Sequence, residues 1–236
     1  MTLPVSAVMA VRDGERYISA ALFSVLAERV RELVIVDDGS SDDTLAIVND
    51  VLTYREESAP RVIVVSESIG VGLGAARNLG LRHATMPYIA MIDADDLWVK
   101  GKTKKQIDAL TKMPHPCYSS TLVDHFVEPG CTPPGTFGPD KLGTIRLNVP
   151  SNLLAHRDVF GIVGGFDPML PSASDVDWFQ RAHQLGVRRV EVPEVLMRKR
   201  VHDRNLSLDE REDRRGEVVS VLTRKVTPSM FSVEGY

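Results

Sequence analysis

Apolar and polar positions alternate along the first hundred residues in a pattern that predicts strands and helices in turn. Short apolar runs bounded by polar or glycine residues are typical of buried strands, and they cover Val5–Val11, Leu33–Val36, Val62–Val65 and Tyr88–Ile92. Between these runs, apolar residues recur at helical spacing over 15–28, 42–55 and 70–84. Strand–helix alternation with short connections predicts parallel strands with helices on both faces of the sheet.

The pattern changes after Leu97. Helices are expected over Lys102–Lys112 and Ser174–Leu185, strands over Tyr118–Val127, Arg188–Val192 and Val195–Val201, and a charged helix over 208–225. Gly186 is suited to end the helix that precedes it. The segment 128–143 contains four prolines and four glycines, which predicts a loop.

Composition narrows the classes of function. The 236 residues carry a net charge of −4, which indicates neither a nucleic-acid surface nor a polybasic membrane patch. Cys117 and Cys131 match no zinc or redox spacing, so a reducing compartment is the simpler assumption. No apolar run is long enough for a transmembrane helix, and residues 1–5 lack the features of a secretory signal. We expect a cytoplasmic protein, with peripheral membrane contact left open.

The acidic residues Asp93, Asp95 and Asp96 directly follow an apolar strand. Because side chains alternate along a strand, Asp93 and Asp95 are expected on the same side. Carboxylates held close together repel unless a cation lies between them, and a divalent metal with oxygen ligands suits phosphate chemistry. The alternative is a solvated turn or a helix cap before Leu97.

A glycine-rich segment, Gly70-x-Gly72-x-x-Ala75, fits the dinucleotide-binding fingerprint weakly, with Asp93 at the distance of a ribose ligand. This segment follows the third strand rather than the first, and such glycines also serve as a simple turn. Arg77, in the helix that follows, is either a solvent-facing cation or a phosphate or ribose contact. An NAD-dependent oxidoreductase is therefore one alternative function.

Polar residues of the second half offer further candidate chemistry. Asp175 opens a predicted helix, so it is either a capping residue or a general base facing a cleft. His202 follows a basic stretch in which Arg198 and Arg200 would share one strand face and could meet a diphosphate.

The order of these segments resembles that of the family 2 glycosyltransferases, which have the GT-A fold. The resemblance extends from Val5 to about Ser207, and it rests on 8–18, 35–42, 74–78, 93–96, 164–167, Ser174-Asp175 and His202-x-x-Asn205-x-Ser207. It implies a single α/β domain that is Rossmann-like, with a mostly parallel mixed sheet. Residues 1–98 would form the nucleotide-sugar-binding half, 99–208 the half with acceptor site and catalytic base, and 209–236 a helical tail.

The resemblance also implies roles for individual residues. The nucleotide would be bound by Asp38 and Arg77, by the backbone of Ala10 and Val11, and by Asp93, which would contact the ribose or the donor sugar. The metal, Mn²⁺ or Mg²⁺, would be held by Asp95 and His202. Asp175 would be the catalytic base.

The implied reaction is an inverting transfer of one sugar from a nucleotide sugar, with a UDP-sugar as the expected donor, to a hydroxyl of an unknown acceptor. The Gln-x-x-Arg-Trp motif of processive synthases is absent from the sequence, which favours transfer of a single sugar. Ser174 stands where the family usually has glutamate. That departure leaves a catalytically silent nucleotide-sugar-binding protein of the same fold as a second alternative.

Overall fold

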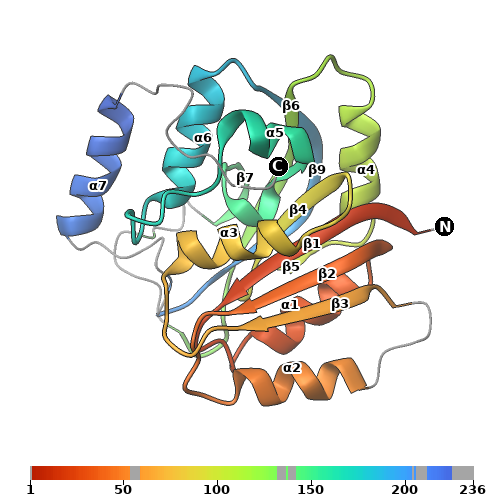
Figure 1. Cartoon of the computed structure of the whole chain (residues 1–236), viewed down its shortest axis with the longest axis vertical. Coiled ribbons are helices and arrows are strands. Elements are labelled where there is room, and N and C mark those ends of the chain that lie inside the picture. Colours follow the sequence, from red (N-terminus) through yellow and green to blue (C-terminus); the bar gives the residue numbers. More distant parts are fainter. Residues whose placement is uncertain are drawn as a thin grey trace.

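The computed structural model describes residues 2–53, 59–131, 137, 142–203, 205 and 212–224. These residues form one domain around a nine-stranded sheet with the order β3-β2-β1-β4-β8-β6-β9-β5, in which β7 pairs with β6 (Figure 1). The strands are β1 (Leu3–Val11), β2 (Val30–Asp37), β3 (Arg61–Ser66), β4 (Tyr88–Asp93), β5 (Leu97–Trp98), β6 (Cys117–Val127), β7 (Gly143–Arg146), β8 (Leu154–His156) and β9 (Arg188–Val201). The helices are α1 (Ile18–Leu26), α2 (Thr44–Thr53), α3 (Leu73–His83), α4 (Lys102–Leu110), α5 (Arg157–Val163), α6 (Ser174–Gln184) and α7 (Glu212–Thr223).

The first four strands run in the same direction, as the alternation of strand and helix signals predicts. β1 pairs in parallel with β2 and with β4, and β2 pairs in parallel with β3. Their carboxyl ends therefore meet at one edge of the sheet, which is where ligands bind in sheets of this kind.

The alternation of side chains along β1 divides the core into two layers. Val5, Ala7 and Met9 pack with α1 and α2 on one face of the sheet. Val8 and Ala10 point to the other face, where they pack with α3, α5 and α6. Figure 1 shows α1 and α2 on one side of the β1–β3 strands and α3 on the other. The expectation of helices on both faces is confirmed.

The second half of the sheet is mixed, and several of its elements are absent from the sequence-based prediction. β6 and β9 are parallel, whereas the three-residue β8 runs antiparallel to both β4 and β6 and so joins the two halves. The pattern also missed β5, β7, α5 and the short 3₁₀ turn Pro150–Asn152. All of these elements are too short to show a hydrophobic period.

The two strands expected at 188–192 and 195–201 are wrong, because they form the single strand β9. The pairing with β6 is irregular at the expected break: Thr121 pairs with Val192, and the next residue, Leu122, pairs with Val195. Pro193 lies in the skipped stretch of β9 and has no N–H to donate. A bulge therefore accommodates the proline without ending the strand.

Two other expectations fall partly outside the described residues. Most of the loop expected at 128–143 lies outside the described residues. The segments 206–211 and 225–236, on either side of α7, also lie outside them.

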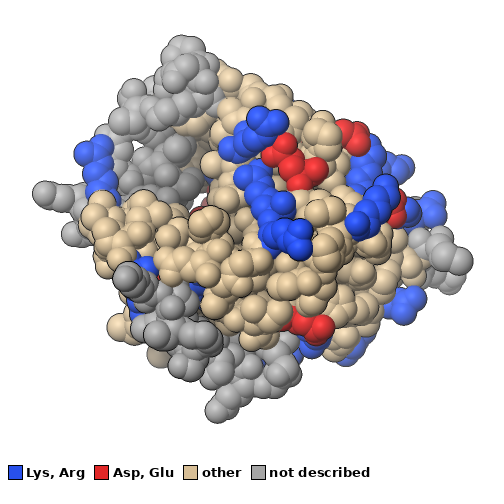
Figure 2. All heavy atoms as spheres, turned by 90° about the horizontal axis from the view of Figure 1, so that it is seen from above, with Lys and Arg blue, Asp and Glu red and all other residues tan. Residues whose placement is uncertain are grey.

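No helix among the described residues is long and apolar enough to cross a membrane. The cytoplasmic location expected from the sequence stays a prediction. On the face shown in Figure 2, basic side chains lie beside acidic ones.

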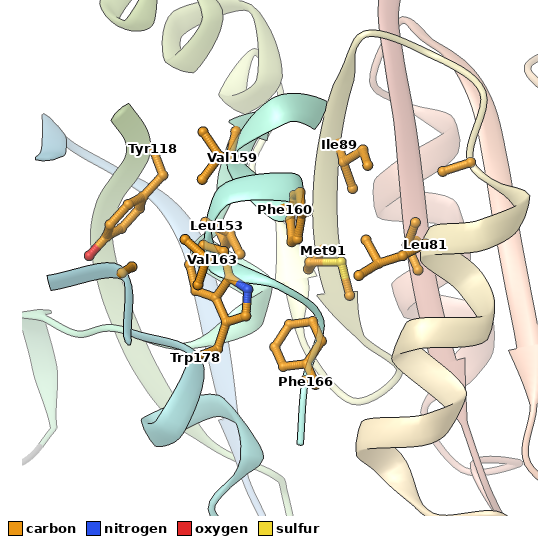
Figure 3. Packing of buried hydrophobic residues seen from close by; sticks show 14 of the residues in the cluster. Leu81, Ile89, Met91, Tyr118, Leu153, Val159, Phe160, Val163, Phe166 and Trp178 are labelled. Carbon is orange, nitrogen blue, oxygen red and sulfur yellow. The ribbon is translucent and has the colours of Figure 1, made fainter. Parts of the chain in front are cut away.

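An aromatic cluster fixes α6 against the sheet. The fully buried indole of Trp178 packs against Phe160 and Phe166, with ring centroids 5.3 and 6.1 Å away, and against Tyr118 of β6 at 5.9 Å (Figure 3). Its Nε1–H donates a hydrogen bond to the Gly164 carbonyl at 3.0 Å. Burial of this aromatic surface holds the first turn of α6 in a fixed position relative to the sheet edge.

A buried lysine, Lys102, begins α4, a helix that packs against β6 and β9. Lys102 is fully buried, its Nζ lies 4.4 Å from the centre of the Trp98 ring, and it donates a 2.8 Å hydrogen bond to Gln106. Burial lowers the pKa of Lys102 to about 7, although the charge of Glu28 opposes the shift. The charged lysine is therefore more costly in the folded than in the unfolded protein.

We expect Lys102→Met to change how stability depends on pH. Because the folded-state pKa is about 7 and the ordinary value is 10.5, the unfolded protein binds more protons between these values, so stability should rise with pH across that window. The free energy of unfolding of the variant minus that of the wild type should thus fall by on the order of 3 kcal/mol from pH 6 to pH 9.5.

The measurement is urea unfolding of both proteins at several pH values. Lys104→Met, which removes an exposed lysine of the same helix, is the control and should show no such trend. A constant difference between wild type and Lys102→Met at all pH values would contradict a lowered pKa.

Candidate active site

A cleft of about 640 Å³ opens at the carboxyl ends of β1, β2 and β4. Its walls come from both halves of the chain, including the start of α6 and the end of β9. Eight residues to which the resemblance assigns a role line this cleft: Ala10, Val11, Asp38, Arg77, Asp93, Asp95, Asp175 and His202. The structure therefore brings the predicted set together, while the role of each residue stays a prediction.

The wall next to β1 is built from two interlocked loops. Asp13 accepts a 2.8 Å hydrogen bond from the Ser41 N–H, and its own N–H donates to the Ser40 hydroxyl at 2.9 Å. The Gly14 N–H donates to the Thr44 hydroxyl at 2.8 Å. These contacts tie the loop after β1 to the start of the segment after β2. They therefore fix the part of the cleft wall that begins at Ala10 and Val11.

Asp38 closes the glycine-rich segment onto the cleft. Its carboxylate, almost fully buried, accepts hydrogen bonds from the N–H groups of Val71 at 2.6 Å and Gly72 at 3.0 Å. Gly72 has a φ of +90°, which side chains rarely adopt. Because the N–H groups that a pyrophosphate would need are bound by Asp38, the geometry does not support the dinucleotide-binding alternative.

Arg77 and Asp93 form an ion pair at the floor of the cleft. Arg77 Nη2 lies 2.7 Å from Asp93 Oδ1, and the guanidinium carbon lies 5.3 Å from the centre of the Phe166 ring. The arginine side chain is only 4% exposed, so its interpretation as a solvent-facing cation is wrong. It presents a fixed positive charge to any ligand in the cleft.

The acidic residues meet through a turn and not through strand alternation. β4 ends at Asp93, and the Asp96 N–H donates to the Asp93 carbonyl at 3.1 Å, which reverses the chain. Asp95 therefore lies beyond the strand, and the expectation that it leaves the strand on the same side as Asp93 is wrong. The turn still places carboxylate oxygens of Asp93, Asp95 and Asp96 within 4.8 Å of one another.

Asp95 faces an imidazole. His202 Nε2 lies 3.0 Å from Asp95 Oδ2, and Asn205 Nδ2 donates to the same oxygen at 3.2 Å. Tyr17 packs on the imidazole with ring centroids 4.5 Å apart. Burial acts to raise the pKa of Asp95, but the hydrogen bond with His202 and the charge of Lys199 outweigh it, so the pKa is lowered. Asp95 is thus an ionised carboxylate held beside an imidazole nitrogen.

This pair fits a divalent metal ion. Two neighbouring ligands of an octahedral ion with bonds of about 2.1 Å are about 3 Å apart, which is the separation of Asp95 Oδ2 and His202 Nε2. Asp93 offers a further carboxylate close by. The donor set of oxygen and imidazole suits Mn²⁺ or Mg²⁺.

Asp96 has a different environment from its two neighbours. It is fully buried and accepts hydrogen bonds from the Ser151 hydroxyl at 2.6 Å and the Arg200 N–H at 3.1 Å. Burial raises the pKa of Asp96 to about 7, although Lys199, 3.5 Å away, opposes the shift. Asp96 therefore holds the acidic turn against β9 and does not line the cleft.

The expectation that Arg198 and Arg200 meet a diphosphate is wrong, because both face carboxylates of the protein and neither lines the cleft. Arg198 pairs with Asp124 at 3.3 Å, while Arg200 pairs with Glu128 and donates to the Asp95 carbonyl at 2.9 Å. Lys199, which lies between them in β9, has the opposite orientation and lines the cleft.

The start of α6 presents Asp175 to the cleft. Ser174 is buried beside it, and within the described part of the chain the Asp175 carboxylate makes no hydrogen bond. Asp177, two residues further along the helix, is buried and pairs with Arg181 at 2.7 Å. The two carboxylates of this first turn therefore divide between packing and the cleft.

Tyr17, Lys199 and Asn205 also line the cleft, although the sequence-based prediction assigned them no role. The period-2 alternation along β9 could have separated Lys199 from its arginine neighbours. The contact of Tyr17 with His202 spans most of the chain, and no local pattern encodes it.

The chain belongs to glycosyl transferase family 2, because the model of this family, a family of glycosyltransferase enzymes, matches residues 6–164. A relative, the E. coli UDP-Glc:alpha-D-GlcNAc-diphosphoundecaprenol beta-1,3-glucosyltransferase WfgD, is 34% identical over 110 residues, which are 46% of this chain and 41% of that protein. The chain spans only 32% to 43% of the length of three such curated relatives.

Two solved structures share the fold. S. aureus TarS 1-349 in complex with UDP-GlcNAc has a TM-score of 0.68 at 20% identity, and the match covers 94% of this chain and 65% of that chain. The mannosyltransferase PcManGT from Pyrobaculum calidifontis, in complex with GDP-Man and Mn²⁺, has a TM-score of 0.67 at 20% identity, with 87% and 59% covered. The expected GT-A fold is confirmed.

Arg181 is expected to be essential for the position of α6. It is buried and donates to the carbonyls of Val163 and Gly165 as well as to Asp177. Arg181→Met leaves the buried Asp177 carboxylate without its nearest cation, while Arg224 stays 4.0 Å away, so the free energy of unfolding should fall by about 3 kcal/mol. Urea unfolding measures this loss.

Arg82→Met, which removes an exposed arginine of α3, is the control and should change stability by less than about 0.5 kcal/mol. The double variant Arg181→Met/Asp177→Leu should recover part of the loss, because it removes both charges. A loss from Arg181→Met no larger than that of the control would show that the buried pair does not hold α6.

Proposed function

We propose that this protein is a metal-dependent, inverting glycosyltransferase that moves one sugar from a nucleotide sugar to an acceptor hydroxyl. The observation that carries the proposal is the convergence of three groups on one cleft: the Asp95–His202 pair, the Arg77–Asp93 pair and the Asp175 carboxylate. A bound cation, a fixed arginine and an available base are what displacement of a nucleoside diphosphate needs.

The nucleotide would occupy the wall formed by β1 and the glycine-rich segment. The backbone of Ala10 and Val11 would line the base pocket, and Asp38 would contact the base while it holds the glycine-rich segment closed. Arg77 would contact the nucleoside or the diphosphate, and Asp93 the ribose or the donor sugar. A UDP-sugar is the proposed donor, since WfgD is named for UDP-Glc and the TarS structure contains UDP-GlcNAc, although PcManGT contains GDP-Man.

Asp95 and His202 would hold the metal. When bound, the ion would supply Lewis-acid neutralisation of the departing diphosphate. The PcManGT structure contains Mn²⁺, and an imidazole ligand favours Mn²⁺ slightly over Mg²⁺.

Asp175 would act as the general base. It would accept the proton of the acceptor hydroxyl as that oxygen forms a bond to the anomeric carbon, while the bond from this carbon to the diphosphate oxygen breaks. Attack from the face opposite the leaving group inverts the configuration, and no covalent enzyme intermediate forms.

The division of labour along the chain is part of the same proposal. Residues 1–98 would bind the nucleotide sugar, 99–208 would supply the base and the acceptor surface, and 209–236 would be a helical tail. Val149, Pro171 and Ser172 also line the cleft, and the acceptor would contact them.

The first test is calorimetric titration of UDP, GDP, dTDP and NAD, each with and without Mn²⁺. One nucleoside diphosphate should bind in a metal-dependent manner, and Asp95→Asn should weaken that binding at least tenfold, because it removes a charged ligand. Asp158→Asn, which removes an exposed carboxylate of α5, is the control and should bind as the wild type does. Binding of NAD alone, or of no nucleotide, would overturn the proposal.

The second test separates binding from chemistry. Asp175→Asn should bind the same nucleoside diphosphate and metal as the wild type but lose sugar transfer or donor hydrolysis by on the order of a thousandfold, since the amide cannot accept the proton. Turnover is measured by release of the nucleoside diphosphate from candidate nucleotide sugars. A wild type that binds but hydrolyses or transfers no sugar would instead indicate a silent binding protein.

A further inference from the structure

Lys199 is a buried cation of the cleft that none of the proposed roles uses. It lies near the end of β9, its side chain is 9% exposed, and it lines the cleft together with Asp95 and Asp175. Its Nζ lies 3.5 Å from Asp96 Oδ2. The neighbouring Arg198 and Arg200 pair with Asp124 and Glu128 instead, so Lys199 is the cation that β9 directs to this place.

Lys199 is surrounded by negative charge. Burial would lower its pKa, but the carboxylates of Asp96, Asp95, Asp93 and Asp175 outweigh this effect and raise it. The side chain therefore carries a full positive charge at neutral pH. A metal ion at Asp95 and His202 would neutralise the same carboxylates as Lys199 does.

We propose that Lys199 is an internal counter-cation that competes electrostatically with the metal for the acidic turn, so that the free protein binds the ion weakly. Two cations near one another repel, and the repulsion is large where water is excluded. A bound diphosphate attracts the ion independently of Lys199, so Lys199 lowers the metal affinity of the site both with and without nucleotide. This inference rests on the proposed metal-dependent function.

A purely structural role for Lys199 explains less of what is seen. The Asp96 carboxylate already accepts hydrogen bonds from the Ser151 hydroxyl and the Arg200 N–H. A lysine needed only as the partner of Asp96 would have no reason to line the cleft beside Asp175. The charge of Lys199 instead acts on the carboxylates of the acidic turn and on that of Asp175, from a position that lines the cleft in which a metal–diphosphate complex would lie.

The experiment is calorimetric titration of MnCl₂ into the protein without nucleotide and then with saturating UDP. Lys199→Met should bind Mn²⁺ at least about tenfold more tightly than the wild type in the absence of UDP, because one repelling charge is removed. The Mn²⁺ affinity measured with saturating UDP should rise by about the same factor, because the repulsion between Lys199 and the ion acts in both states. Lys199→Arg keeps the charge and should behave as the wild type does.

Two further variants separate charge from packing. Arg198→Met removes an adjacent cation that faces Asp124 and should leave the Mn²⁺ affinity unchanged. Lys199→Met/Asp96→Asn also removes the carboxyl group that Lys199 pairs with, so its Mn²⁺ affinity should fall back towards the wild-type value. Thermal unfolding of each variant shows that the protein is folded.

The outcomes distinguish this inference from the proposed function. A folded Lys199→Met variant that binds Mn²⁺ no more tightly than the wild type overturns the role of Lys199 alone. Tighter binding in Lys199→Arg as well would overturn it too, because charge would not be the cause. No Mn²⁺ binding by any variant, with or without UDP, would overturn both this inference and the proposed metal site.

Discussion

The compensation of negative charge at one edge of the sheet is the constraint on which the rest of this structure depends. Asp93, Asp95 and Asp96 lie within one turn, and like charges so close are costly in a partly buried site. Each finds a positive or polar partner on a different element: Arg77 of α3 for Asp93, His202 after β9 for Asp95, and Lys199 of β9 for Asp96. Strands and helices far apart in the sequence are therefore held together by the same acidic turn.

The same constraint explains why the chain has two differently organised halves. The parallel strands β1, β2 and β4 bring their carboxyl ends to one edge, but they supply only part of the compensating charge. The rest comes from β9, which reaches the edge only because the short β8 links β4 to β6 and β6 pairs with β9. Packing of Trp178 and the Asp177–Arg181 pair then fix α6, and with it Asp175, across the cleft.

Local patterns predicted what local physics determines. The first four strands and the helices between them follow from hydrophobic periods, and the acidic cluster follows from polar residues at strand ends, whereas most of the expected site residues are implied by the family resemblance. The short strands β5, β7 and β8 have no period to detect, and tertiary pairing alone creates them. Strand alternation along β9 separates Lys199 from Arg198 and Arg200, but it does not say which of the two faces is turned to the cleft. The partners Asp124 of Arg198 and Asp96 of Lys199, which belong to other elements, show this.

The chemistry of the two sides of the cleft also explains why the sequence indicates a donor more clearly than an acceptor. A nucleoside diphosphate with its metal carries concentrated charge, so its site needs carboxylates, an imidazole and fixed cations, and these leave recognisable marks in a sequence. An acceptor hydroxyl requires only one base and a surface of matching shape. Val149, Pro171 and Ser172, which line the cleft, carry no charge and would suit such a surface. In the proposed function, shape and loop structure would therefore decide which acceptor binds, and single residues such as these do not encode them.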